Sequence, residues 1–279
     1  MPDMVHKTSQ QGPKMSTSDL NQIAARLEGL EETIIHKLID RAQFLRNGDA
    51  YVPGKSGFTN AGLQTGVVPR SAPGASGSAP PSLFEIRLVY QERMDAEFGR
   101  FVVPEERPFT ADLPTPKRSV HIDASQFAGI DLTRVSVTEE LLDGYLRFLP
   151  RLCGPGDDGQ YGSAVEHDVM ALQAVARRVH FGALYVGDFK YQADADGFKT
   201  LLEAQDRRAI EEKLTRPEVE QRILARVAEK VAHIQARINP LVRRKVDPEV
   251  FMAFYRDLVI PLTKEGEVRY IEERVCSTT

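Results

Sequence analysis

The sequence predicts an all-α fold, a multi-helix bundle in a single domain, and three observations support this prediction. Apolar residues recur in steps of three and four along several segments, whereas strand-type alternation over five or more residues is essentially missing. Serine, threonine or aspartate precedes several of these segments, and prolines end them. One long segment is apolar almost all around, as a helix at the centre of a bundle must be.

The composition excludes several classes of function. The 279 residues include 36 lysines and arginines against 40 aspartates and glutamates, with both signs scattered along the chain. This balance supplies no basic field of the kind that attracts nucleic acids or anionic membranes. No stretch is long and apolar enough to span a bilayer, and no apolar run follows a basic start at the N-terminus. We therefore expect a cytoplasmic protein without nucleic-acid or membrane partners.

Metal ions and disulfides are equally unexpected. Only two cysteines occur, Cys153 and Cys276, which excludes a disulfide framework. The histidines stand at no ligand spacing to one another or to a cysteine, and no glycine-rich phosphate loop is present. The sequence thus predicts neither a metal site nor a nucleotide site.

The N-terminal part of the chain contains one predicted helix between two irregular segments. Residues 1–15 are expected to form a disordered tail, and the helical domain covers residues 16–279. The first helix is predicted from Ser18 to Leu45, because serine and threonine can cap its first amides and its apolar residues follow helical spacing. A flexible loop is expected at about residues 50–81, where glycine, proline and serine collect.

Two more helices are predicted before the centre of the chain. One runs from about Ser82 to Phe101, with Met94 and Phe98 among the side chains expected to face inward. The other begins near Ser136, where a glutamate three residues later completes the spacing of a capping box, and it stops before Pro150. The prolines between these helices predict an irregular crossing segment.

The most informative segment is the long apolar helix predicted from Ser163 to Gln192. Ser163 and Glu166 again have the spacing of a capping box, and no proline interrupts the segment. A helix that is apolar around its circumference lies in the middle of a bundle. Its few ionic residues therefore need partners or a function.

The C-terminal part is predicted to contain a short helix at about 197–214 and two long ones. The first long helix opens at Thr215, where a cap residue is followed by an early proline and a glutamate, and its apolar spacing extends to Ile238. The last helix opens at Asp247, is kinked by Pro261 and continues to about Val275.

Several ionic residues lie where the apolar pattern predicts the core. On the central helix, Lys190 projects from the stripe of core residues and Arg178 lies at its edge. On the last helix, Thr263 and Glu267 stack one turn apart, while Glu220 lies in the first turn of the preceding helix. Together they describe a polar cavity in an apolar bundle, which is where bundles build their sites.

Taken one at a time, these residues also fit plainer interpretations. Arg178 is compatible with a solvated face, and Lys190 with a side chain that reaches towards the end of its helix. Glu220 and Glu267 are compatible with surface salt bridges to Arg216 or Lys264. The pattern alone therefore does not name a reaction.

A family resemblance makes the interpretation more specific. Segments Gly162–Asp168, Arg177–Gly182 and Phe189–Gln192 resemble the central helix of the fungal and plant type of chorismate mutases. Ile260–Val268 resembles the C-terminal motif of that family, and Leu30–Arg41 resembles its first helix. The matching segments span nearly the whole chain except the loop around residues 50–81.

The resemblance implies an all-helical homodimer that converts chorismate, a small dicarboxylate, into prephenate by a [3,3] rearrangement without a cofactor. Arg178 and Thr263 would bind substrate carboxylate, and Lys190 would reach a carboxylate and the ether oxygen. Protonated Glu267 would donate to the ether oxygen, which gains negative charge as its bond to carbon breaks. Glu220 would orient the ring hydroxyl. The fixed geometry would hold the enolpyruvyl arm over the ring.

Three positions depart from the family pattern. Ala24 stands where the first helix of the family carries a site arginine, and Arg26 is about 200° further around the helix. Arg216 replaces an asparagine near the ring hydroxyl and is expected to add a cation at the substrate-binding site. Arg178 and Lys190 are twelve residues apart instead of eleven, and we expect a single-residue π-bulge between Ala183 and Asp188 to absorb the extra residue.

The departures leave three functional hypotheses open. The first is a chorismate mutase with a rearranged set of cations, in which Arg216 or Arg26 compensates for Ala24. The second is an enzyme of the same fold that acts on a modified chorismate or a related enolpyruvyl or cyclohexadiene acid in a specialised pathway. The third is a catalytically weak regulatory or binding homologue.

The resemblance also implies an effector site for aromatic amino acids. Arg100, Gly162 and Ser163 match the family's effector site, which lies at the dimer. Gly99 stands where a second arginine is expected. We therefore expect the effector site to be partial and feedback by tyrosine or tryptophan to be doubtful.

Overall fold

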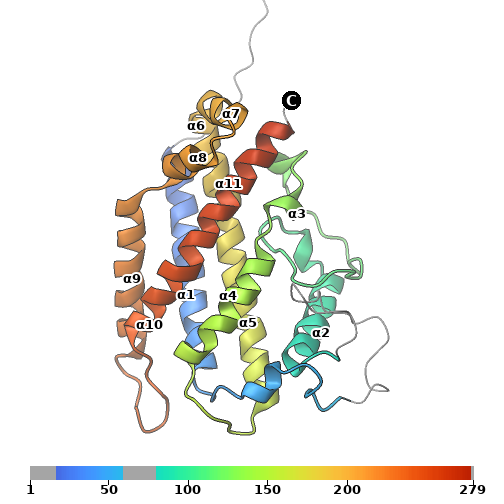
Figure 1. Ribbon diagram of the computed structural model, residues 1–279, viewed down its shortest axis with the longest axis vertical. Coiled ribbons are helices and arrows are strands. Elements are labelled where there is room, and N and C mark those ends of the chain that lie inside the picture. The colour runs from blue at the N-terminus through green and yellow to red at the C-terminus, as the bar shows by residue number, and fades with distance from the viewer. Residues whose placement is uncertain (1–16, 59–79, 278–279) are drawn as a thin grey trace, which may run out of the picture.

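The structure is a computed structural model that describes residues 17–58 and 80–277 (Figure 1). The predicted tail at residues 1–15 and residues 59–79 of the predicted loop lie outside the described residues. The described residues form helices and connections without a strand, so the all-α prediction is confirmed. The long helices are α1 (Thr17–Arg41), α2 (Leu83–Glu97), α4 (Thr138–Leu152), α5 (Tyr161–Phe181), α9 (Pro217–Gln235) and α11 (Ile260–Cys276). The short α-helices are α3 (Leu132–Val135), α6 (Gly187–Ala193), α7 (Ala195–Glu203), α8 (Arg207–Leu214) and α10 (Pro248–Phe254).

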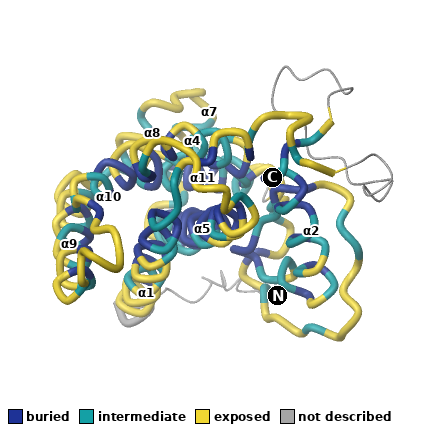
Figure 2. The backbone as a smooth tube through the Cα atoms, turned by 90° about the horizontal axis from the view of Figure 1, so that it is seen from below, coloured by how far each residue is buried: buried dark blue, intermediate teal, exposed yellow. Residues whose placement is uncertain are grey.

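Helix α5 lies in the middle of the bundle, as its apolar pattern predicts. Helices α1, α2, α4 and α11 all pack against it. Figure 2 shows α5 among the buried segments, whereas α9 at the edge of the bundle is exposed over much of its surface. Val169, Leu172, Val175 and Val179 of α5 are completely buried. Burial of each such side chain stabilises the fold by about 1.5–3 kcal/mol.

Two π turns interrupt the helices that carry the predicted site. The first π turn (Gly182–Val186) joins α5 to α6 without a break in the helix. It confirms the predicted bulge, although it begins one residue earlier than expected. The second π turn (Tyr255–Val259) joins α10 to α11 and ends just before Pro261, whose ring nitrogen has no hydrogen to donate. The apolar pattern of residues 251–259 does not predict this second turn.

The predicted capping boxes at Ser136 and Ser163 are wrong. The N-cap residue of α4 is Val137, whose N–H donates to Nε2 of buried His180 at 3.1 Å. An imidazole of the central helix thus accepts from the Val137 amide just before α4, and no side chain caps the helix. Helix α5 begins at Tyr161, two residues before Ser163, and no side chain caps it.

Two further expectations are corrected by packing. Met94 and Phe98 are 49% and 67% exposed, because the inner face of α2 is formed instead by Phe84, Leu88 and Glu92, which follow one another at steps of four. The buried Glu92 carboxylate accepts hydrogen bonds from the Phe109 and Thr110 amides of the crossing segment.

Helix α4 also differs from its prediction at its C-terminal end. It continues through Pro150 to Leu152 instead of stopping before the proline. Pro150 lies in the last turn, where only one helical hydrogen bond is lost. Leu149 and Leu152, on either side of it, are buried in the core, and their burial favours the extra turn.

Candidate active site

Four of the predicted site residues come together between the central helix and α11. Lys190 of α6 approaches Glu267 of α11, with 2.6 Å between Nζ and Oε2. One turn away, Arg178 of α5 donates from Nη1 to Oγ1 of Thr263 at 3.1 Å. Both contacts are made with the same face of α11, because Thr263 and Glu267 are four residues, or about one turn, apart on that helix.

The first π turn aligns these two contacts. Twelve residues separate Arg178 from Lys190, which on a straight α-helix would point the side chains about 120° apart. The wider π turn lies between them and absorbs the extra residue. Both side chains therefore reach the same face of α11.

Small residues allow α11 to approach the π turn closely. A Cβ atom built on Gly182 would lie 2.6 Å from Cγ2 of Thr263 and 3.3 Å from Nη1 of Arg178. A Cβ atom on Gly266 would lie 2.6 Å from Cβ of Ala183. Both distances are too short for real side chains, so the site exists in this form only with glycine at these two positions.

Glu267 is a buried carboxyl group. Only 6% of the residue is exposed, and burial raises the pKa of the Glu267 carboxyl, although the charges of Lys190 and Arg178 act in the opposite direction. The Lys190 ammonium has a second acceptor, the carbonyl oxygen of Leu214 at the end of α8, at 2.8 Å. The site thus holds one carboxyl group that loses its proton less readily than an exposed glutamate, and one lysine that is fixed by two acceptors.

Arg178 is buried with much of its hydrogen-bonding capacity unused. The residue is 3% exposed, and its buried Nε has no hydrogen-bond partner among the described residues. Its partner Thr263 is a neutral hydroxyl, which itself donates to the carbonyl oxygen of Val259 at 2.7 Å. A guanidinium presents five N–H donors in a fork that matches a carboxylate. This arrangement is therefore suited to an anionic ligand.

Glu220 and Arg216 lie further out than these four residues. Glu220 forms an ion pair with Lys264 of α11, with 3.0 Å between Oε1 and Nζ, and both side chains are about 30% exposed. Arg216 is exposed and donates from Nη1 to the carbonyl oxygens of Lys213 and Thr215. The structure therefore places Glu220 at the outer edge of the site, which we call the rim. It does not bring Arg216 into contact with the four residues described above.

Arg26 does not take the place left by Ala24. Its guanidinium lies 3.3 Å from the Glu105 carboxylate and 5.2 Å from the centre of the Phe181 ring. Arg177, the neighbour of Arg178, approaches the same carboxylate. Arg26 thus belongs to the side of the central helix that carries Arg177.

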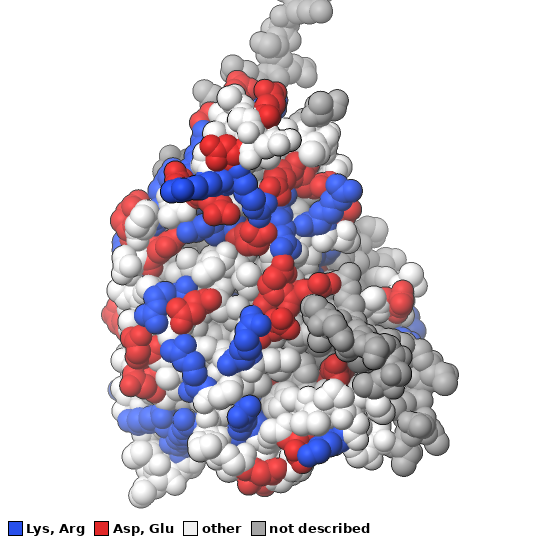
Figure 3. Space-filling model, in the orientation of Figure 1, with Lys and Arg blue, Asp and Glu red and all other residues white. Residues whose placement is uncertain are grey.

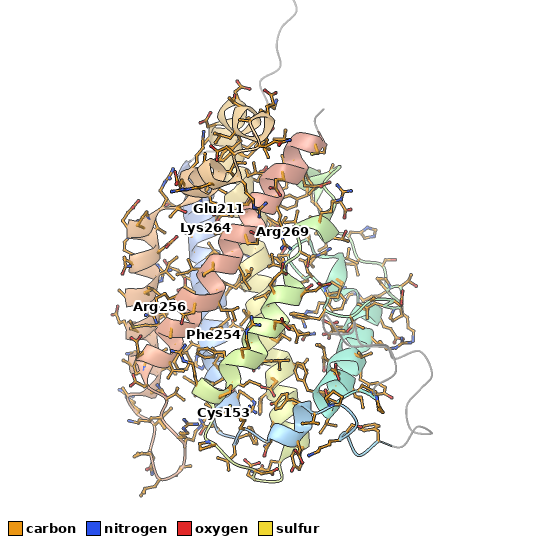
Figure 4. The ribbon with its side chains drawn as sticks, in the orientation of Figure 1. Cys153, Glu211, Phe254, Arg256, Lys264 and Arg269 are labelled. Atoms are coloured by element: carbon orange, nitrogen blue, oxygen red, sulfur yellow. The ribbon has the colours of Figure 1, made fainter. Side chains whose placement is uncertain are left out.

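A hollow of about 350 Å³ opens beside the rim. It is lined by Arg208, Glu211, Glu212, Thr215, Pro217 and Lys264. Figure 4 shows Glu211 of α8 and Lys264 of α11 next to one another on the surface of the bundle. The sequence predicted neither the hollow nor the contact with the Leu214 carbonyl. Every residue carries the same backbone oxygen, and a hollow between three elements leaves no pattern in the sequence.

The residues of the predicted effector site do not lie together within this chain. Arg100 is held by Asp95, Glu106 and Gln173, and it meets α5 at Gln173. Gly162 and Ser163 are exposed in the first turn of α5, about 15 Å further along that helix.

Gly99 has no room for the second arginine. Its φ angle of 84° lies in the left-handed region, and a Cβ atom there would lie 2.3 Å from Cγ2 of Val120.

The described part of the chain offers no metal cluster and no membrane-spanning helix. It contains no group of three or more metal-ligating side chains. None of its helices is long and apolar enough to cross a membrane. On the face shown in Figure 3, lysines and arginines are interspersed with aspartates and glutamates.

Comparisons with known proteins give a consistent result. No protein-family profile matches the chain. A chorismate mutase from Schizosaccharomyces pombe is 32% identical over 263 residues, which cover 92% of this chain and 96% of that protein. The crystal structure of a chorismate mutase from Candida albicans in complex with L-Trp superposes with a TM-score of 0.76 at 29% identity, covering 92% of each chain. AtCM1 with tyrosine bound in its allosteric site has a TM-score of 0.75 at 30% identity, covering 92% of this chain and 96% of that one.

Proposed function

This chain belongs to the chorismate mutase family, and we propose that it is an isomerase that converts chorismate into prephenate in aromatic amino-acid biosynthesis. The bond that breaks joins the ether oxygen to the ring, and the bond that forms joins the enolpyruvyl arm to the ring. Both changes are intramolecular, so the protein needs to supply only position and electrostatic stabilisation.

The proposed roles follow from the contacts around Glu267. Arg178 and Thr263 bind a carboxylate, since the guanidinium is buried and incompletely hydrogen-bonded. Lys190 and the protonated form of Glu267 stabilise the negative charge that develops on the ether oxygen. Glu220 accepts a hydrogen bond from the ring hydroxyl at the rim, where Arg216 adds positive charge.

The observation that carries the proposal is the partly buried Lys190–Glu267 pair, which lies one turn from Arg178, whose buried Nε has no hydrogen-bond partner among the described residues. A carboxyl group whose pKa is raised by burial, next to two cations, suits a dianion that gains charge on an ether oxygen. A purely structural ion pair would not require an unpaired guanidinium beside it.

The test is loss of chorismate absorbance with the purified protein, followed by product identification by mass spectrometry and NMR. We expect prephenate to form at an enzymatic rate and Glu267→Ala to reduce this rate by a factor of about 10² to 10³. Glu229→Ala, at an exposed position of α9, is the matched control and should retain the full rate. A reaction that consumes only a modified chorismate or a related enolpyruvyl acid would favour the second hypothesis, and binding without turnover the third.

We further propose a homodimer with a weak response to aromatic amino acids. Met94, Phe98 and Val102, spaced at four residues, are exposed apolar side chains that a second protomer can cover. The partial effector site, in which Arg100 already has three partners, supports a weak response. A cytoplasmic location stays a prediction from the sequence.

A further inference from the structure

A second contact ties α6 to α11 beside the Lys190–Glu267 pair. The hydroxyl group of Tyr270, three residues after Glu267 on α11, donates to Oδ1 of Asp188 at 2.6 Å. Asp188 lies two residues before Lys190, in the first turn of α6. Asp188 is 5% exposed, and Tyr270 is completely buried. The two contacts therefore join the same pair of helices, and the second of them takes no part in the proposed chemistry.

The Tyr270 ring fits closely against the start of α6. A Cβ atom built on Gly187 would lie 3.1 Å from Cδ1 of Tyr270, so the ring packs directly over this glycine. The ring of Phe127 meets it edge to face, with 6.2 Å between the ring centres. Burial and the neighbouring Asp188 carboxylate raise the pKa of the Tyr270 hydroxyl, which therefore remains a donor. Asp188 thus faces a donor that is fixed in position and keeps its proton.

The π turn before α6 needs a contact that holds it in place. The regular α-helix is the far commoner form, and single π turns persist where the surrounding structure favours them. If the extra residue between Arg178 and Lys190 were accommodated beyond Lys190 instead, each residue of α6 would turn by about 100° around the helix axis. The Lys190 ammonium would then point away from Glu267 and from the carbonyl oxygen of Leu214.

The contact of Lys190 alone does not fix the rotation of α6. A lysine side chain is long and flexible, so its ammonium can stay near Glu267 over a range of backbone positions. Asp188 has a short side chain and lies about 200° around α6 from Lys190. A hydrogen bond at this second point leaves α6 little freedom to rotate and the π turn little freedom to move along the chain.

We propose that Asp188 and Tyr270 are positioning residues for the reaction. Their hydrogen bond holds the π turn ahead of residue 188 and thereby directs Lys190 towards the ether oxygen of the substrate. Both residues act through Lys190, and neither contacts the substrate. The inference rests on the proposed function, because it assigns a role to the neighbours of Lys190 in that reaction.

Steady-state kinetics with chorismate test the inference through single substitutions. Tyr270→Phe removes only the hydroxyl group, and it should lower kcat by a factor of about 10 while KM changes by less than about threefold, since the affected charge stabilises the transition state. Asp188→Asn keeps an oxygen acceptor and should stay within about threefold of the wild-type kcat, whereas Asp188→Ala should resemble Tyr270→Phe. Tyr145→Phe, which removes a buried hydroxyl group that donates to Asp168 at 2.8 Å, is the matched control and should leave kcat unchanged.

A double-mutant cycle separates positioning from a structural role. In the Lys190→Met background, Tyr270→Phe should change kcat by less than about twofold, because no lysine is left to direct. An equal loss of kcat in the wild-type and Lys190→Met backgrounds would overturn the inference. Thermal unfolding shows whether each variant is folded at the assay temperature, and Asp188→Ala replaces Tyr270→Phe in the cycle if the latter does not fold.

The pH profile gives a further readout. Burial raises the pKa of the Glu267 carboxyl, and three cations oppose this rise: Lys190, Arg178 and Lys264. If Tyr270→Phe moves the Lys190 ammonium away, the pKa of Glu267 rises further, and the alkaline limb of the profile of kcat against pH should shift to higher pH. An alkaline limb at its wild-type position would show that the lysine has not moved, which also overturns the inference.

The two proposals fail in distinguishable ways. If the wild-type protein does not convert chorismate, the proposed function fails, and the inference about Asp188 and Tyr270 falls with it. If the wild-type protein converts chorismate and Tyr270→Phe has the wild-type kcat, only the inference about these two residues is overturned.

Discussion

Lys190 and Glu267 form a partly buried pair in which the ammonium nitrogen and a carboxylate oxygen lie 2.6 Å apart. The pair brings together two elements that are distant in sequence, α6 and α11, and it depends on the first π turn for its alignment. Burial and the neighbouring cations act on this carboxyl group in opposite directions. The ability of Glu267 to donate a proton to a bound ligand therefore depends on pH.

The activity should fall as pH rises through the pKa of Glu267. Burial raises this pKa, so the protonated donor persists to a higher pH than for an exposed glutamate and is then lost. Glu267→Gln keeps a neutral donor at all pH values and should flatten the alkaline limb of the profile of kcat against pH. An unchanged alkaline limb in the variant would assign the titration to another group.

The same raised pKa has a consequence for stability. The folded protein binds the Glu267 proton more tightly than the unfolded chain, so the free energy of unfolding should decrease as pH rises from the unfolded value towards the folded one. In Glu267→Gln this part of the decrease should be absent. Urea denaturation of both proteins between pH 4 and pH 8 measures the difference, and parallel curves would contradict the expectation.

Removal of the Thr263 hydroxyl should impair catalysis more than folding. Thr263→Val keeps the shape of the side chain but leaves Arg178 without its hydroxyl acceptor. We expect kcat/KM to fall by a factor of about 10 to 100, while the free energy of unfolding changes by less than about 1.5 kcal/mol. If kcat/KM stays within threefold, Thr263 does not position Arg178 for the reaction.

A single methyl group at position 182 should disrupt the site. Gly182→Ala would place its Cβ atom 2.6 Å from Thr263 Cγ2, so α11 or the π turn has to move. We expect a loss of about 1–3 kcal/mol in stability and a larger loss of activity than in Thr263→Val. Gly29→Ala in α1, where no atom lies within 4 Å of the new Cβ, is the control and should be neutral or stabilising.

The fold should depend strongly on a buried carboxylate that the reaction does not use. Asp168 of α5 accepts hydrogen bonds from Arg41 at 2.6 Å and from the hydroxyl groups of Tyr51 and Tyr145. Asp168→Ala leaves the guanidinium buried and unpaired, which should cost about 3–5 kcal/mol of unfolding free energy. Asp143→Ala, which removes an exposed ion pair with Arg147, should cost less than about 1 kcal/mol. Similar effects of the two substitutions in urea denaturation would contradict this role.

The helices could be predicted because each buries a regular apolar stripe. Their ends could not be predicted as well, since a cap depends on which groups lie nearby in space. The Val137 amide donates to His180, 43 residues further along the chain, and no local pattern around Ser136 records this. Met94 and Phe98 were assigned to the core because they are apolar, whereas buried Glu92 occupies the inward position and is satisfied by two backbone amides.

The site was predictable in part for a similar reason. The spacing of Arg178 and Lys190, set against the family pattern, predicted the first π turn within one residue. The contact between Lys190 and the Leu214 carbonyl could not be predicted, because any residue carries the same backbone oxygen. The ion pair of Lys264 with Glu220 beside the hollow follows only from the packing of α8, α9 and α11.

The most direct test of the account is a proton NMR time course of chorismate with the wild-type protein and with Lys190→Met in parallel. Lys190→Met removes the cation while keeping most of the side-chain volume. We predict that the wild-type protein converts chorismate into prephenate and that Lys190→Met slows the conversion by a factor of at least about 10². Chorismate that stays unchanged with the folded wild-type protein, or a Lys190→Met variant as fast as wild type, would contradict it.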